Sequence, residues 1–206
     1  MKPVIVLVLA ASFIASCDRP PQQKDVVLDH NTMDHSKMDH GSGHTMDSSA
    51  DAEKAPYDLQ FIDTMIAHHE GALDMAQLAD TRAAHPELKT LAKNIIADQR
   101  KEIEQMRTWR SAWFANSPAA VNMKMPGMHE GMTGMDLKKL DSLKVNEFDL
   151  EFIRQMIPHH EGAIIMAREL NGKTERPELR ALADAVIKAQ TDEITKMREW
   201  QTAWSQ

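Results

Sequence analysis

The feature that most constrains the fold of this 206-residue chain is an internal repeat. Residues 57–113 align without a gap to residues 148–204, and 27 of the 57 aligned pairs are identical. The most similar stretch is HHEGA, which occurs at residues 68–72 and again at residues 159–163. Chance does not give this degree of identity, so the region is a duplication and both copies should fold into the same unit.

Each copy is predicted to form two helices, because its apolar residues recur at helical spacing. The first helix is expected from about Tyr57 to Asp80. The second is expected to begin at Pro86, which suits a first helical turn, and to end near Trp113. We therefore expect helical hairpins at residues 57–115 and 148–206, and an all-α, four-helix bundle built from the two. Such bundles commonly hold metal sites between facing helices.

Placing residues 100° apart on these helices predicts which side chains face inward. Met65 and His69 are four residues apart, and His68 and Met75 are seven apart, so each pair shares a helix face. Neutral imidazoles and thioethers suit a soft cation such as Cu(I) or Ag(I), whereas hard ions need oxygen ligands. The candidate metal ligands are Met65, His68, His69, Met75, Met106, Met156, His159, His160, Met166 and Met197.

A single inward Met or His is usually a core residue, since Met fills apolar interiors well. Four buried imidazoles at matching positions are harder to explain this way, because unpartnered buried polar groups reduce stability. Inward polar residues on the second helices could orient the imidazole N–H groups or bind one another. They are Gln99, Glu102, Gln190 and Glu193. Glu70 and Glu161 match between the copies, yet both are expected to point outward.

The segment between the copies, residues 116–147, is rich in methionine. Its Pro and Gly residues are expected to stop any helix, which leaves a flexible linker. A sticky linker that covers one end of the bundle is one explanation, and an open soft-metal site is the other. The candidate ligands here are Met123, Met125, Met128, His129 and Met132.

Residues 1–16 are predicted to be a secretory signal peptide, whose apolar run is too short to span a bilayer. The run ends at the only cysteine, Cys17, in a sequence that resembles the bacterial lipobox, where this cysteine is lipidated. We therefore expect an extracytoplasmic lipoprotein held in the periplasm or cell envelope by its lipid.

Residues 17–56 lack apolar periodicity and are predicted to be a disordered tether. Its Met-Asp-His units resemble the Met/His-rich segments of bacterial periplasmic copper-resistance proteins and favour weak metal capture. The residues concerned are Met33, His35, Met38, His40, His44 and Met46.

Several classes of function are disfavoured by the sequence. The net charge of −7 argues against nucleic acid as a partner. Because no nucleophile–base pair or glycine-rich phosphate loop stands out, we expect a protein that is not an enzyme. The expected partners are metal ions, the membrane through the lipid, and a metal-exchange protein.

The duplicated motif, with Met65, the two histidines, Gly71 and Met75, resembles the bacterial family called domain of unknown function 305, which includes CopM-like proteins. The resemblance spans about residues 57–204. It implies a ferritin-like helical fold, extracytoplasmic copper binding and copper tolerance, with the His and Met of the motif as ligands. Two alternatives stay open: a di-iron or hemerythrin-like oxygen-binding or oxidase bundle, and a metal-free structural stress lipoprotein.

Overall fold

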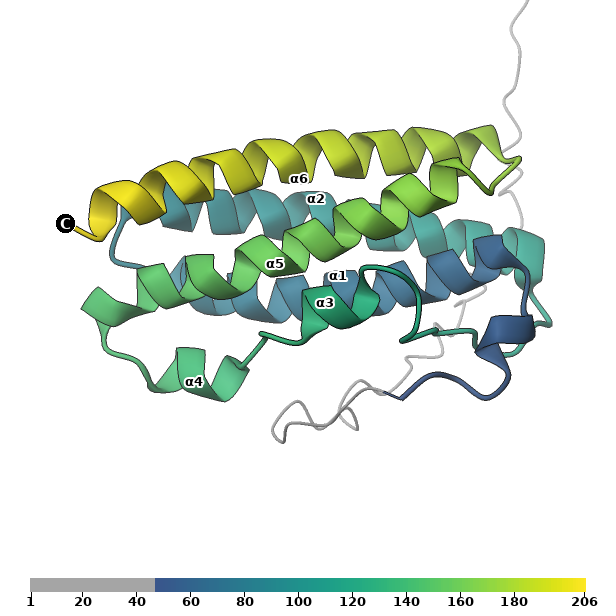
Figure 1. Cartoon of the computed structure of the whole chain (residues 1–206), viewed down its shortest axis with the longest axis horizontal. Coiled ribbons are helices and arrows are strands. Elements are labelled where there is room, and N and C mark those ends of the chain that lie inside the picture. The colour runs from purple at the N-terminus through teal and green to yellow at the C-terminus, as the bar shows by residue number, and fades with distance from the viewer. Residues whose placement is uncertain (1–46) are drawn as a thin grey trace, which may run out of the picture. The chain divides into compact units, whose positions relative to one another are not determined.

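The computed structural model describes residues 47–206, and these residues form helices and loops without any strand (Figure 1). The four long helices in this range are α1 (Tyr57–Arg82), α2 (Pro86–Phe114), α5 (Val145–Asn171) and α6 (Pro177–Trp204). The shorter helices are η2 (Ala52–Lys54), α3 (Met128–Met132) and α4 (Leu137–Ser142). The prediction of an all-α protein is confirmed.

The long helices form two hairpins that correspond to the two sequence copies. Helix α1 packs along α2, α5 packs along α6, and α1 and α5 pack against each other. Pro86 and Pro177 open α2 and α6. Proline is tolerated there because the first N–H of a helix has no intrahelical acceptor.

The two hairpins share their apolar core. One buried cluster joins Ala72, Met75 and Ala76 of α1 to Phe152 and Met156 of α5. A second cluster joins Phe61, Ile62 and Met65 of α1 to Ala163 and Met166 of α5. Since each cluster draws on both hairpins, neither hairpin buries its apolar face without the other.

The linker departs from the expectation that Pro and Gly stop any helix there. Pro126 and Gly127 precede α3 instead of interrupting it, and Gly127 has a φ of 90°, which glycine adopts without strain. Helix α3 packs against α5 and α1. The Asp136 side chain accepts a hydrogen bond from the Lys139 N–H at 2.8 Å and so caps α4. These two short helices have no apolar periodicity of their own, so they are stabilised by tertiary contacts and by caps.

The predicted tether and signal peptide lie largely outside the described residues, as do Cys17 and the tether ligands. Residues 48–55, which the sequence pattern assigns to the tether, are held against the linker. The Ser49 N–H donates to the Val121 carbonyl at 2.8 Å, and the Met123 N–H donates to the Ser48 hydroxyl at 3.0 Å.

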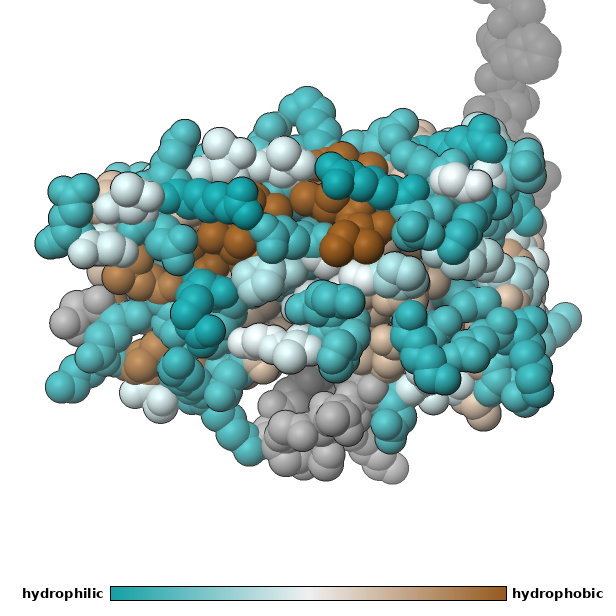
Figure 2. Space-filling model, in the orientation of Figure 1, coloured by the Kyte–Doolittle hydropathy of each residue, from teal (hydrophilic) through white to brown (hydrophobic). Residues whose placement is uncertain are grey.

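Figure 2 shows hydrophilic side chains over most of one face, with apolar side chains gathered along α5 and α6. Among the described residues, the exposed large apolar side chains are those of Val145 and Ile165. Within residues 47–206, no helix combines the length and apolar character needed to cross a bilayer.

Candidate metal centre

The imidazoles of His68 from α1 and His159 from α5 lie against each other at the interface of the two hairpins. Their ring centroids are 3.8 Å apart and both residues are fully buried. None of their four ring nitrogens makes a hydrogen bond of good geometry among residues 47–206, although each ring lies close to the backbone of the facing histidine. Burial and then the neighbouring imidazoles hold the pKa of both rings well below the ordinary 6.5. Both are therefore neutral at pH 7, and each has a nitrogen lone pair for a ligand.

The neighbouring histidines, His69 and His160, are each paired with a glutamate on the second helix of their own hairpin. His69 Nε2 lies 2.7 Å from Glu102 Oε2, and His160 Nε2 lies 2.8 Å from Glu193 Oε2. A carboxylate can only accept, so each Nε2–H donates. In the neutral ring, Nδ1 is then the unprotonated nitrogen, and it is buried without a partner in the described part of the chain. A carboxylate orients metal-binding imidazoles in this way.

The six candidate methionines of the helices are fully buried and divide between the two core clusters. Each cluster takes two from one hairpin and one from the other. Met65, Met106 and Met166 lie in one cluster, and Met156, Met197 and Met75 lie in the other. The duplication therefore distributes the buried thioethers symmetrically between the two core clusters.

The two candidate glutamines are buried but do not orient the imidazoles. Both amide atoms of Gln99 and the carbonyl oxygen of Gln190 lack partners among the described residues. Four residues could have accepted hydrogen bonds from the imidazole N–H groups. In the structure, only Glu102 and Glu193 among these four do so.

The donor set limits which ions could bind. Among residues 47–206, no group of three or more His, Cys, Asp or Glu side chains is placed to hold a metal ion. A di-iron centre, which needs a carboxylate cluster, has no counterpart there. An ion in this interior would instead need thioether sulfur as well as imidazole nitrogen.

The linker candidates are placed less uniformly. Met125 and Met128 are buried in the cluster that holds Met65, Met123 and Met132 are partly buried against it, and His129 is exposed. They are thus part of a packed segment, not an open loop.

Two matched residues of the repeat acquire a role that only the structure reveals. Glu70 accepts from Arg107 at 2.9 Å, and Glu161 accepts from Arg198 at 2.5 Å. Each pair joins the two helices of one hairpin. All four residues recur at the offset of the duplication, which was the signal available in the sequence.

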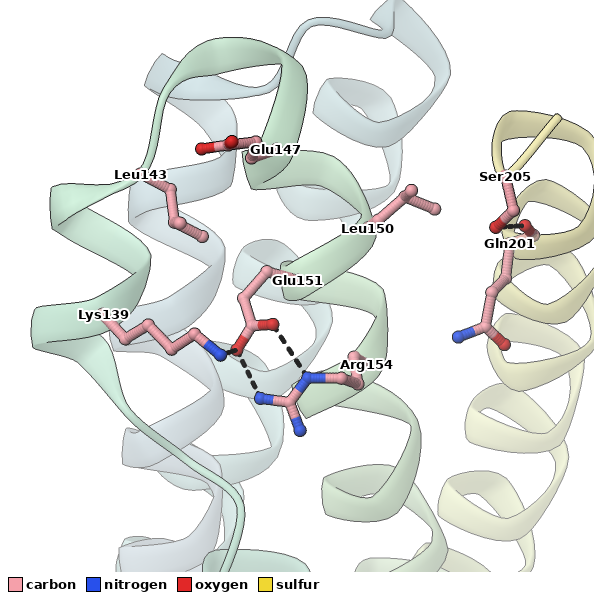
Figure 3. A pocket seen from close by; sticks show the side chains of 8 residues that line it. All are labelled: Lys139, Leu143, Glu147, Leu150, Glu151, Arg154, Gln201 and Ser205. Atoms are coloured by element: carbon pink, nitrogen blue, oxygen red, sulfur yellow. Dashed lines mark hydrogen bonds and ion pairs between the residues drawn. The ribbon is translucent and has the colours of Figure 1, made fainter.

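A surface pocket of about 490 Å³ lies between α4, α5 and the end of α6 (Figure 3). Its cations, Lys139 and Arg154, both contact Glu151, and the hydrogen bond from Arg154 lowers the pKa of that carboxyl to about 2. None of the candidate metal ligands lines this pocket.

These features define a duplicated helical protein that buries imidazoles and thioethers where its two halves meet. The family described as domain of unknown function (DUF305) matches residues 58–201, and the chain belongs to this family. The resemblance inferred from the motif is confirmed.

Solved structures of CopM are similar to this chain. CopM in the Cu(II)-bound form is 47% identical, with 71% of this chain and 97% of CopM covered and a TM-score of 0.63. The Cu(I)-bound form is 45% identical, with 71% and 96% covered and a TM-score of 0.62. The Ag-bound form obtained by soaking is 44% identical, with 71% and 96% covered and a TM-score of 0.61. No curated protein matches this chain.

Proposed function

We propose that this chain binds copper as Cu(I), or silver, outside the cytoplasm, and that it sequesters the metal or hands it over without catalysing a reaction. One observation carries the proposal: six ring nitrogens of four fully buried histidines have no partner among residues 47–206. Leaving a buried polar group unpaired costs about 1–3 kcal/mol. A bound ion would offset that cost.

The chemistry of the donors supports a soft monovalent ion. Imidazole and thioether are neutral, so they neutralise no charge on a hard divalent cation but bind Cu(I) and Ag(I) well. CopM, 44–47% identical to this chain, has been crystallised with Cu(I), Cu(II) and Ag. The pairing of two helical hairpins further supports a ferritin-like four-helix bundle as the fold that holds the ion.

Within this site, His69 and His160 would each offer Nδ1, because glutamate holds Nε2. Met65 and Met156 lie one turn before them on the same helix faces. The His68–His159 pair brings donors from both hairpins together, so an ion bound there would join the two halves.

We also propose that the protein is anchored to a membrane outside the cytoplasm. A signal peptide followed by a lipidated Cys17 would place the helices outside the cytoplasm on a membrane surface. Replacing Cys17 with serine should release the protein from the membrane fraction. Continued membrane attachment of this variant would contradict the anchor.

The test is a competition titration with a chromogenic Cu(I) chelator on the full chain and on a variant. The variant carries Met65→Leu, Met156→Leu, His69→Gln and His160→Gln. Leucine keeps the volume, and glutamine can still donate to glutamate. We expect tight Cu(I) binding to be lost while helicity measured by circular dichroism is retained.

A control variant with serine at the six Met and His positions of residues 33–46 should keep tight binding. Unchanged affinity in the helix variant, with loss in the tether variant, would move the site to the N-terminal segment. Stoichiometric iron with an oxo-bridged chromophore would favour the di-iron alternative. Absence of copper and silver binding at micromolar concentration would favour the metal-free one.

A further inference from the structure

The backbone of α3 lies directly on the buried imidazole of His68. A Cβ added at Gly131 would lie 2.6 Å from His68 Nε2 and 3.3 Å from the Cα of Gly162. Figure 1 shows α3 beside α1 and α5, the two helices that it contacts. The added Cβ would also lie 3.2 Å from the His159 carbonyl. With glycine at position 131, no side chain there covers this nitrogen, which makes no hydrogen bond of good geometry among the described residues.

Two linker thioethers lie next to this position. Gly71 is three residues after His68, so both lie on the same side of α1. A Cβ at Gly71 would lie 3.2 Å from Met135 Sδ and 3.3 Å from the terminal methyl of Met132. Both methionines are partly buried, whereas the candidate ligands of the long helices are fully buried. The Met135 sulfur and the Met132 methyl group therefore lie against α1 at the residue three positions after His68.

We infer that Met132, Met135 and His68 form a second soft-metal site, through which a monovalent ion enters the centre. Two thioethers and one imidazole are a neutral, soft donor set. The two methionines are partly exposed, whereas His68 belongs to the buried His68–His159 pair. The inference rests on the proposed function, because an entry site requires that the centre hold an ion.

The site belongs to one repeat only. At Gly162, the counterpart of Gly71, the nearest atoms to an added Cβ are the Gly127 carbonyl at 2.3 Å and backbone atoms of Gly131. The backbone of Gly127 and Gly131 therefore occupies, next to Gly162, the position that the Met135 sulfur occupies next to Gly71. Within residues 47–206, the linker thus breaks the symmetry of the duplication, because methionine side chains lie against Gly71 and backbone lies against Gly162.

The test compares the full chain with a Met132→Leu, Met135→Leu variant, since leucine preserves volume and removes sulfur. Transfer of Cu(I) from a chelator is followed by stopped flow, and Ag(I) equivalents are counted by calorimetry. We expect transfer to slow by about tenfold, one Ag(I) equivalent to be lost, and the affinity of the tightest equivalent to stay unchanged. Release should slow by the same factor, because an entry route alters both directions equally.

Two glycine variants provide a matched pair on the same linker. Gly131→Ala places a methyl group against His68 Nε2 and should also slow Cu(I) transfer. Gly134→Ala is the control, because nothing lies within 4 Å of its added Cβ. It should transfer Cu(I) at the rate of the unmodified chain. If Gly131→Ala displaces α3 and loses helicity, the Met132→Leu, Met135→Leu variant still tests the entry site.

The inference is overturned if the methionine variant takes up Cu(I) at the unmodified rate and keeps every Ag(I) equivalent. In that case tight binding persists and the proposed function stands. If the unmodified chain binds neither Cu(I) nor Ag(I), the proposed function itself fails and the entry site with it.

Discussion

His68 and His159 lie where a core would ordinarily hold two leucines. Their unpartnered nitrogens should weaken the metal-free protein. We predict that His68→Leu with His159→Leu raises the free energy of unfolding of the metal-free protein by about 1–3 kcal/mol and weakens Cu(I) binding. Urea denaturation measures the first effect, and chelator competition measures the second.

The control is the adjacent pair, His69→Leu with His160→Leu. These changes remove the imidazole N–H groups that donate to Glu102 and Glu193. Both carboxylates lose their hydrogen-bond donor, so this variant should be less stable than the unmodified protein. A loss of stability in the His68 and His159 variant as well would mean that those imidazoles have stabilising partners.

The same two imidazoles should make the metal-free protein sensitive to mild acid. Burial lowers their pKa in the folded state, whereas an unfolded histidine titrates near 6.5. Below that pH the unfolded state binds more protons, so stability falls as pH falls. Each imidazole contributes up to about 1.4 kcal/mol per pH unit.

Urea midpoints at pH 7.5, 6.5 and 5.5 test this prediction, with metal removed by chelation. The unmodified protein should lose stability below pH 6.5, and the His68→Leu, His159→Leu variant should lose less. The Glu151 ion pairs do not interfere, because the stability that this carboxylate contributes is complete above its ordinary pKa of 4.5 and is lost only as the pH falls from there toward its folded-state pKa of about 2. Equal slopes for the two proteins would show that these imidazoles do not titrate as inferred.

At the scale of the helices, local patterns predicted some features and could not predict others. Apolar spacing, with Pro86 and Pro177, indicated where the long helices begin. By the same 100° spacing, Asp63 falls on the side of α1 opposite Met65, yet Asp63 is buried. Arg110 binds its carboxylate at 2.8 Å, and the Ala120 N–H donates to it at 2.9 Å. A helical wheel cannot show that the end of α2 and the linker cover that face.

For the candidate site, too, the sequence predicted some features and could not predict others. The 100° spacing placed the histidines and methionines inward, because helix geometry alone determines which side they occupy. Which ring nitrogens find glutamate, and which find nothing, depends on α2 and α6. From the sequence, Met135 is only one of five linker methionines that could form an open soft-metal site, because the linker has no periodicity from which its neighbour Gly71 could be inferred.

The glycines that follow the two His-His-Glu motifs should differ in their tolerance of a side chain. A Cβ at Gly162 meets the Gly127 carbonyl at 2.3 Å, whereas a Cβ at Gly71 meets flexible ends of methionine side chains at 3.2 Å or more. We predict that Gly162→Ala destabilises the protein by about 1–3 kcal/mol. Gly71→Ala should be near neutral, since alanine also favours helix by about 0.5–1 kcal/mol.

Thermal unfolding followed by circular dichroism compares these two variants at equivalent positions. Gly162→Ala should also loosen α3, which can be detected as faster proteolysis within the linker. Equal stability of the two variants would mean that α3 is not fixed against α5 at Gly162.

At the scale of the whole molecule, the turn of each hairpin is clamped to the other hairpin. In the first clamp, Asp149 of α5 accepts from the backbone N–H groups of Ala84 and His85, at 3.0 and 2.9 Å, and binds His85 Nδ1 at 2.6 Å. The His85 ring stacks on Trp204 at a centroid distance of 3.7 Å. The carboxylate, which is almost fully buried, thus ties the first hairpin to the start of α5 and the end of α6.

The second clamp uses the equivalent positions with different chemistry. Arg176, the counterpart of His85, lies 3.2 Å from Asp58 and 4.0 Å from the ring centroid of Trp113. This aspartate is more exposed than Asp149. A partly exposed ion pair contributes less than a buried carboxylate that accepts backbone hydrogen bonds, so the two clamps should differ in strength although they lie at equivalent positions of the repeat.

Replacing each aspartate with alanine compares how much the two clamps contribute to the free energy of unfolding. Asp149→Ala leaves the Ala84 and His85 N–H groups without an acceptor and should lower the free energy of unfolding by about 2–4 kcal/mol. Asp58→Ala should cost about 1 kcal/mol or less, and Asp149→Asn, which keeps an oxygen acceptor, should fall between them. Urea denaturation of the metal-free proteins at pH 7.5 measures all three. Equal losses for Asp149→Ala and Asp58→Ala would mean that charge, which both positions carry, holds the hairpins together, and not the backbone hydrogen bonds that only Asp149 accepts.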